Sequence, residues 1–122
     1  MLLGGEQAPI NVEEMKKHVV YDGLYDPDHI TIQFFWQAVT SFSPDDRALL
    51  LKFITSCSRP PLLGFGELNP KICIRFSSAD QSRLPTASTC VNLLKLPGYK
   101  DFETLKEKLL YAVRSASGFE LS

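Results

Sequence analysis

Apolar side chains recur at helical spacing in the middle of the chain. Between about residues 28 and 41 they fall at steps of three and four, which predicts a helix with one buried face. Ser43 is a favourable N-cap and Pro44 a favourable first helical residue, so a second helix is expected to begin there and to end before Pro60. The side chains expected to face inward are Ile32, Phe35, Trp36, Val39 and Phe42 in the first helix, and Leu49, Leu50, Phe53, Ile54 and Cys57 in the second.

Two further helices are expected near the ends of the chain. Asn11 and Glu14 have the spacing of a capping box, which predicts a short helix through His18. Asp101 is the expected cap of a last helix, which Gly118 ends. The inner face of this last helix is formed by Phe102, Leu105, Leu109, Ala112 and Val113.

Two stretches have the pattern of strands. Residues 71–76 alternate between apolar and other side chains, and residues 91–96 form an apolar run typical of a strand buried on both faces. Residues 21–27, 58–70 and 77–89 are rich in turn-forming or polar residues and are expected to be connectors. Helices mixed with few strands, without a regular strand–helix–strand repeat, predict an α+β fold in which helices flank a small sheet.

The length of 122 residues fits one small domain. Residues 1–25 do not have the pattern of a natural start, because their short helix is too short to be stable alone and a turn-rich connector follows it. We therefore interpret residues 1–25 as the end of a preceding domain and residues 26–122 as the domain itself.

Charge and composition exclude several classes of function. Thirteen basic and fourteen acidic residues give a net charge of −1, without the clustered basic surface that a sequence-independent grip on nucleic acid needs. No apolar run approaches the ~18 residues that span a membrane. Three cysteines without a secretion signal predict an intracellular location, cytoplasmic and/or nuclear. We therefore expect neither a nucleic-acid partner nor a membrane partner.

Cys90 is the candidate for chemistry among the three cysteines. Cys57 and Cys73 lie within apolar patterns and are expected to be small buried side chains. Cys90 instead follows a small, polar loop at the start of the last strand, a position that holds a thiol firmly and leaves it open to a partner. The cysteine spacing lacks the paired ligands of a structural zinc site, and neither His18 nor His29 has a second ligand at helical spacing, so no metal or other cofactor is expected.

A set of motifs around Cys90 matches one known family. Its pattern is Leu-Pro, Thr-Cys, an asparagine two places after the cysteine, Leu-x-Leu-Pro and a tyrosine, found here at Leu84, Pro85, Thr89, Cys90, Asn92, Leu94, Leu96, Pro97 and Tyr99. Further matches are Phe35-Trp36, Arg59-Pro60-Pro61, Gly64-Phe65 and Gly118-Phe119. In these motifs the sequence resembles the C-terminal lobe of HECT-type ubiquitin-protein ligases over about residues 25–122.

Two residues near Cys90 depart from the family pattern. Ser88 stands where the family often has histidine, so no general base is available at that position, and Val91 stands where phenylalanine is frequent. On this resemblance, residues 1–25 are a remnant of the larger N-terminal lobe and the hinge, and residues 26–122 are the C-terminal lobe.

The resemblance implies a ligase mechanism centred on Cys90. This thiol is expected to accept ubiquitin from a ubiquitin-conjugating enzyme as a thioester and to pass it to a substrate lysine. Thr89 and Asn92 are expected either to orient the thioester carbonyl or to satisfy backbone groups of the loop. In the C-terminal tail, Phe119 is expected to dock and Glu120 is the candidate for accepting a proton from the attacking amine.

The resemblance also implies partners and leaves alternatives. The expected partners are ubiquitin, a conjugating enzyme bound mainly through the missing N-terminal lobe, and substrate lysines. The tail, Gly-Phe-Glu-Leu-Ser, resembles the branch of the family associated with the proteasome, which adds the proteasome to the partners. Two other interpretations remain open: a non-catalytic module that binds ubiquitin or a peptide with Cys90 inert and buried, and a small cysteine hydrolase. One cysteine that reacts fast with a thiol reagent would support the ligase, whereas three slow ones would support the module. Loss of ubiquitin to water as the main outcome would support the hydrolase.

Overall fold

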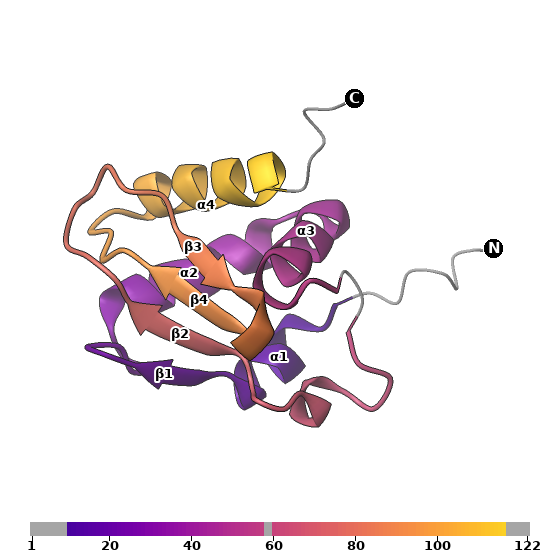
Figure 1. Cartoon of the computed structure of the whole chain (residues 1–122). Coiled ribbons are helices and arrows are strands. Elements are labelled where there is room, and N and C mark those ends of the chain that lie inside the picture. Colours follow the sequence, from indigo (N-terminus) through magenta and orange to yellow (C-terminus); the bar gives the residue numbers. More distant parts are fainter. Residues whose placement is uncertain (1–9, 58–59, 117–122) are drawn as a thin grey trace.

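A mixed four-stranded sheet lies at the centre of the structure (Figure 1). The computed structural model describes residues 10–57 and 60–116. The strands are β1 (Val20–Asp22), β2 (Cys73–Phe76), β3 (Thr86–Ser88) and β4 (Leu93–Leu96), in the order β1-β2-β4-β3. β2 runs parallel to both β1 and β4, whereas β3 is antiparallel to β4.

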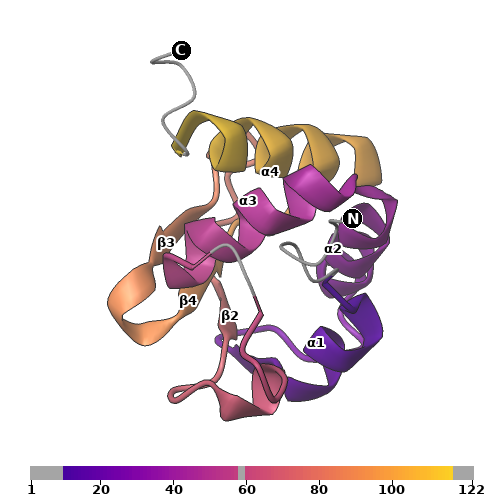
Figure 2. The ribbon, with the colours of Figure 1, turned by 90° about the vertical axis from the view of Figure 1, so that its right-hand side faces the viewer.

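The helices gather on one face of this sheet (Figures 1 and 2). They are α1 (Val12–His18), α2 (Ile30–Ser41), α3 (Pro44–Thr55) and α4 (Phe102–Ala116), with two short 3₁₀ helices, η1 (Phe65–Glu67) and η2 (Thr89–Val91). The expected caps are present: the side chains of Asn11, Ser43 and Asp101 accept hydrogen bonds from the backbone N–H groups three residues later. The prediction of an α+β fold with helices flanking a small sheet is confirmed.

The core lies between the sheet and the helices. α2 supplies its centre, and all five apolar side chains predicted to face inward there are buried. α4 crosses α2 and α3, and the inner face predicted for α4 is buried except for Phe102, which is half-buried. In α3 the prediction is less accurate, because Leu49 and Phe53 are half-buried and Leu51, which was not expected to face inward, is only 2% exposed.

Two strands replace expected connectors. β1 (Val20–Asp22) overlaps the start of the expected connector at residues 21–27, and β3 forms within residues expected to be a loop. Each has three residues, too few for alternation to be visible, and each is stabilised by a neighbouring strand rather than by its own pattern. The last strand begins at Leu93 rather than Val91, which belongs to η2 and is 45% exposed.

Cys57 is exposed, so the prediction that it is buried is wrong. α3 ends at Thr55 because Ser56 adopts the left-handed conformation, with φ of 68°, and turns the chain away before the next inward position. Cys73 is half-buried on β2, on the face opposite Ile74. The side chain of Cys73 is therefore only partly enclosed.

Residues 10–25 contribute to the same core. Ile10, Val12, Met15, Val19 and Tyr25 belong to the hydrophobic cluster formed with α2, α4 and the sheet. The division of the chain at residue 25 into an N-terminal lobe remnant and a C-terminal lobe stays a prediction. Within residues 10–57 and 60–116, no helix is both long and apolar enough to span a bilayer.

Candidate active site

Cys90 lies in the loop that joins β3 to β4. Ser88, the last residue of β3, pairs with Leu93, the first residue of β4, so η2 closes an antiparallel hairpin. β4 also pairs with β2, which fixes one side of the loop to the centre of the sheet. Cys90 itself is exposed. A loop on a rigid scaffold is the usual place for a reactive group, and this exposure contradicts the alternative in which Cys90 is buried.

Asn92 fastens the Cys90 loop to the segment before β2. The residue has a φ of 54°, a left-handed conformation that asparagine tolerates better than most side chains do. Its Nδ2 donates a hydrogen bond of 2.8 Å to the carbonyl oxygen of Pro70. Its own carbonyl oxygen accepts one of 3.0 Å from the backbone N–H of Cys73. The Asn92 side chain therefore satisfies a backbone carbonyl group, which is one of the two roles expected of it. The other role, orienting the thioester carbonyl, stays a prediction.

Thr89 faces a groove on the other side of the loop. The groove has a volume of about 280 Å³ and lies between α3, the β3–η2 segment and the end of α4. It is lined by Leu49, Lys52, Phe53, Ser56, Ala87, Thr89, Val113 and Ala116. A second pocket, of about 540 Å³, adjoins Asn92 and is lined also by Leu51, Thr55, Cys57, Pro60, Pro61 and Leu68. The Cys90 loop thus lies between two concave surfaces.

The three thiols differ in their surroundings. Burial raises the pKa of the Cys73 thiol, and the nearby charge of Asp22 raises it further, so this thiol is harder to ionise than an ordinary one. Cys57 and Cys90 are both exposed. Exposure therefore does not separate these two; what separates them is that Cys90 lies in a loop held by hydrogen-bonded strands on both sides, whereas Cys57 follows the end of a helix.

The two histidines are engaged away from Cys90. His18 Nε2 lies 3.4 Å from Glu14 Oε2 within α1, and His29 Nδ1 accepts a hydrogen bond of 3.1 Å from the N–H of Thr31 as the cap of α2. In the described ranges neither ring forms a couple with the Cys90 thiol. The same ranges contain no group of three or more His, Cys, Asp or Glu side chains able to hold a metal ion.

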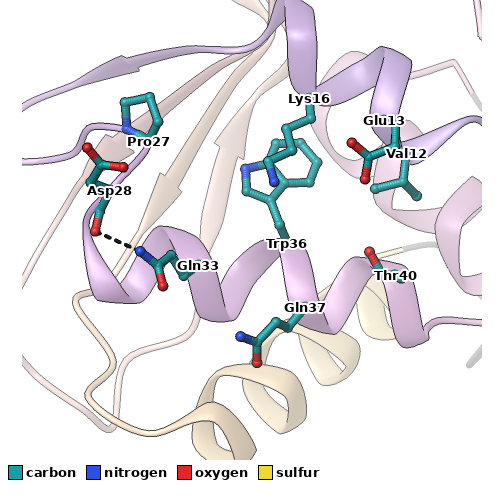
Figure 3. Close-up of a pocket in the computed structure, with 9 residues that line it drawn as sticks. All are labelled: Val12, Glu13, Lys16, Pro27, Asp28, Gln33, Trp36, Gln37 and Thr40. Carbon is teal, nitrogen blue, oxygen red and sulfur yellow. Dashed lines mark hydrogen bonds between the residues drawn. The ribbon is translucent and has the colours of Figure 1, made fainter.

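A pocket larger than either of the two beside the Cys90 loop lies elsewhere, between α1 and α2 (Figure 3). Its volume is about 590 Å³, and Trp36 lies between Lys16 of α1 and the polar side chains of α2. Gln33 Nε2 donates a hydrogen bond of 3.0 Å to the backbone carbonyl of Asp28 at its rim. No residue that lines this pocket belongs to the Cys90 loop, so size alone does not identify the candidate active site.

An exposed apolar patch lies before β3, at the opposite end of that strand from Cys90. The patch is formed by Leu84 and Tyr111, which are 39% and 62% exposed and line a pocket of about 420 Å³ with Glu107 and Lys108. Sequence analysis missed it, although a tyrosine outside the inner face of α4 was a visible signal. We call these two residues the Leu84–Tyr111 patch.

The predicted tail residues Phe119 and Glu120 lie outside the described residues, so their roles stay predictions.

Comparison with known proteins agrees with the motifs around Cys90. The whole chain, residues 1–122, matches the family model described as HECT-domain (ubiquitin-transferase). It is 50% identical over 122 residues to a probable E3 ubiquitin protein ligase of Schizosaccharomyces pombe, with 100% of this chain and 12% of that protein covered. It is 45% identical over 146 residues to ubiquitin-protein ligase E3B of Homo sapiens, with 99% and 14% covered.

A third relative gives the same result. An E3 ubiquitin-protein ligase of Saccharomyces cerevisiae is 45% identical over 122 residues, with 100% of this chain and 13% of that protein covered. The chain thus spans between 12% and 14% of the length of these relatives. The resemblance inferred from the motifs is confirmed, and the chain belongs to the HECT-domain family of ubiquitin transferases.

Proposed function

We propose that this chain is the catalytic C-terminal lobe of a HECT-type E3 ubiquitin ligase and that Cys90 carries ubiquitin as a thioester. The observation that supports this most strongly is the position of Cys90, exposed at the tip of a hairpin whose strands are anchored in the sheet. That position lies within the family motif, in a chain whose relatives are named as ubiquitin ligases.

The first step exchanges one thioester for another. The Cys90 thiolate attacks the carbonyl carbon of the thioester between ubiquitin and the conjugating enzyme; a new C–S bond forms, the old one breaks, and the thiolate of the conjugating enzyme leaves. Reactant and product have the same kind of bond, so the step needs little driving force. Cysteine is the nucleophile that depends least on an adjacent base, which is consistent with the engagement of both histidines elsewhere.

The second step transfers ubiquitin to an amine. A substrate lysine attacks the carbonyl carbon of the Cys90 thioester; the isopeptide C–N bond forms, the C–S bond breaks, and Cys90 leaves as a thiolate. Asn92 serves this step by holding the loop against Pro70, Thr89 faces the adjoining groove, and Glu120 accepts the proton of the amine.

The two steps require that the donor of ubiquitin, ubiquitin itself and the substrate be bound and held in place. The Leu84–Tyr111 patch is the proposed contact for the folded part of the ubiquitin carried on Cys90, because it is exposed, apolar and at the other end of β3. The conjugating enzyme binds mainly to the N-terminal lobe, of which residues 1–25 are the remnant, and the tail sequence adds the proteasome as a partner. The proposed location is intracellular, cytoplasmic and/or nuclear.

A loading assay with four single variants tests the proposal. The chain is mixed with a conjugating enzyme charged with ubiquitin, and adducts are separated with and without a reducing agent. Wild type, Cys57→Ala and Cys73→Ala are expected to form a reducible adduct, Cys90→Ala none, and Cys90→Ser at most an adduct that resists reduction.

Two results would contradict the proposal. A reducible ubiquitin adduct on Cys90→Ala would show that another thiol is the acceptor. Release of free ubiquitin to water as the main product, with an added amine present, would favour the hydrolase instead.

A further inference from the structure

Lys52 lies beside the Cys90 loop, in the last turn of α3. Figure 2 shows the C-terminal end of α3 next to β3 and the turn that follows it, and the contacts of α3 with both η2 and β3 agree with this view. Lys52 is exposed and lines the same groove as Thr89, the residue before Cys90. The ε-amine of one helix and the nucleophile-bearing loop therefore share one small concave surface of about 280 Å³.

Both elements that border this groove, α3 and the Cys90 loop, are held in place by the fold. The side chains of Leu50, Leu51 and Ile54 bury the opposite face of α3 in the core, each at 2% exposure or less. The loop is fixed from its own side by the β3–β4 pairing and by Asn92. Among the side chains that line the two pockets beside η2, Lys52 alone carries a primary amine in the described part of the chain.

We propose that Lys52 is an intramolecular acceptor for the ubiquitin carried on Cys90, so that this chain modifies itself at Lys52. The inference rests on the proposed function, because it needs a thioester at Cys90. The neutral ε-amine attacks the thioester carbonyl carbon, a C–N bond forms and the C–S bond breaks. The proton that the amine loses replaces the lost bond on sulfur, which leaves an isopeptide at Lys52 and a free Cys90 thiol.

The advantage of Lys52 over other lysines is proximity. An amine on a helix that contacts the loop carrying the thioester can react in a unimolecular step, and groups brought together in this way gain large effective concentrations. The rate of self-modification is therefore independent of the concentration of the chain. A lysine of another molecule gives a rate that rises with concentration.

Lys52 also has a purely structural interpretation, which the test must separate from the acceptor role. A cation in the last turn of a helix interacts favourably with the unpaired carbonyl groups there. Arginine preserves this interaction and the length of the side chain but supplies no amine able to form the isopeptide. Lys52→Arg is therefore the informative variant, and Lys17→Arg, an exposed lysine on α1, is its matched control.

The experiment is a single-turnover chase of the full chain. Wild type, Lys52→Arg and Lys17→Arg are loaded with ubiquitin whose own amines are all blocked, further loading is stopped, and reducible and non-reducible adducts are followed at several chain concentrations. We expect wild type and Lys17→Arg to form a non-reducible adduct that maps to Lys52, at a rate independent of concentration. In Lys52→Arg that adduct is absent, and the total non-reducible adduct should form about tenfold more slowly.

The outcomes separate this proposal from the function on which it rests. Equal loss of the thioester in Lys52→Arg and wild type, a different modified lysine, or a rate that rises with chain concentration would overturn the acceptor role while the loading of Cys90 stands. Absence of any reducible adduct in wild type and in both variants would overturn the proposed function, and this inference with it.

Discussion

The two ends of β4 are held in different ways. At its C-terminal end, Leu96 and Tyr99 are fully buried, Tyr25 donates a hydrogen bond of 2.8 Å to the carbonyl of Leu96, and Thr31 donates one of 2.8 Å to the carbonyl of Tyr99. The hydroxyl of Tyr99 in turn donates to the carbonyl of Arg83. At the N-terminal end, Cys90 and Val91 are exposed, and the side-chain bond that holds the loop comes from Asn92.

On the proposed function, this difference lets one short strand contribute both to the stability of the core and to the reaction of Cys90. The buried end fixes the direction of β4, so the exposed end needs few bonds of its own to hold the thiol in place. Changes at the buried end should therefore alter the stability of the protein, and changes at the exposed end should alter the reaction. Four predictions, from the largest expected effect to the smallest, examine this separation.

Tyr99→Ala should have the largest effect and should act on stability. Removing a fully buried aromatic side chain leaves a cavity and unpairs the carbonyl of Arg83, so we expect a loss of about 3–5 kcal/mol in the free energy of unfolding. Denaturant titration measures this loss. If the molecules that remain folded no longer load ubiquitin on Cys90, the two ends of β4 are not separable.

Asn92→Ala should act mainly on the reaction. It removes the bond to Pro70 and places alanine in a left-handed conformation, at a cost of about 2 kcal/mol, whereas Asn92→Gly loses only the bond, at about 1 kcal/mol. We expect loading of Cys90 to slow about tenfold in Asn92→Ala because the loop is no longer fixed.

Alkylation of Cys90 by a small reagent is the control for Asn92. The Cys90 thiol is exposed, and its exposure does not depend on the hydrogen bond from Asn92 to Pro70. Its alkylation rate in Asn92→Ala and in Asn92→Gly should therefore stay close to that of wild type. Equal loading by wild type and Asn92→Ala would show that the bond to Pro70 does not position the loop.

Tyr25→Phe should cost about 1 kcal/mol, because the carbonyl of Leu96 keeps a second hydrogen bond, from the N–H of Ser77, when the hydroxyl is removed. Burial, and then the neighbouring Tyr99, raise the pKa of Tyr25 in the folded protein. The neutral hydroxyl of Tyr25 makes its full contribution to the free energy of unfolding below the ordinary tyrosine pKa of about 10. This contribution declines as the pH rises beyond that value.

Denaturation of Tyr25→Phe between neutral and alkaline pH measures both effects. The variant should be less stable at neutral pH and should lose stability less steeply above about pH 10, where unfolded wild type gains the charge. An equally steep alkaline decline in both proteins would contradict the assigned cause.

Asp46→Asn should have the smallest effect. Arg114 donates two hydrogen bonds, of 2.8 and 3.1 Å, to the Asp46 carboxylate and so ties α4 to α3 beside the groove. These bonds lower the pKa of Asp46, so the stability they add is present above the ordinary aspartate pKa and is lost as the pH falls below it. Arg114 is half exposed, so we expect less than about 1 kcal/mol at neutral pH.

The dependence of stability on ionic strength distinguishes the Asp46–Arg114 ion pair from the Tyr25 hydrogen bond. The contribution of Asp46 should shrink at high ionic strength, whereas that of Tyr25 should not, because screening acts on exposed charges and not on a buried neutral hydroxyl. Thermal unfolding at low and high salt measures the contrast. A salt-independent difference between Asp46→Asn and wild type would exclude the ion pair as its cause.

The helices could be predicted because their signals are local. Ser43 and Pro44 mark the start of α3 in adjacent positions, and the inward side chains of α2 recur at a period that only a helix satisfies. β1 and β3 could not be predicted, because three residues carry no period and their partners lie elsewhere in the chain. Strand pairing is a property of the assembled core.

The site was predicted in part for the same reason. The exposure of Cys90 follows from the small, polar residues before it, which is a local signal. The exposure of Cys57 depends on Ser56 adopting a left-handed conformation without a glycine, which no pattern announced. The bond from Asn92 to Pro70 joins segments far apart in the sequence, so neither residue indicates it alone.

The parallel pairing of the sheet has a consequence for protein synthesis. A growing chain releases β1 first, yet Val20 finds its partner only when Cys73 has been made, and β2 finds β4 later still. α4, which covers α2 and α3, follows Cys90 in the chain and leaves the ribosome after it. In a nascent copy, Cys90 is therefore made before α4 can pack on α2 and α3, so the loop that carries the thiol reaches its final surroundings only when the last helix is in place.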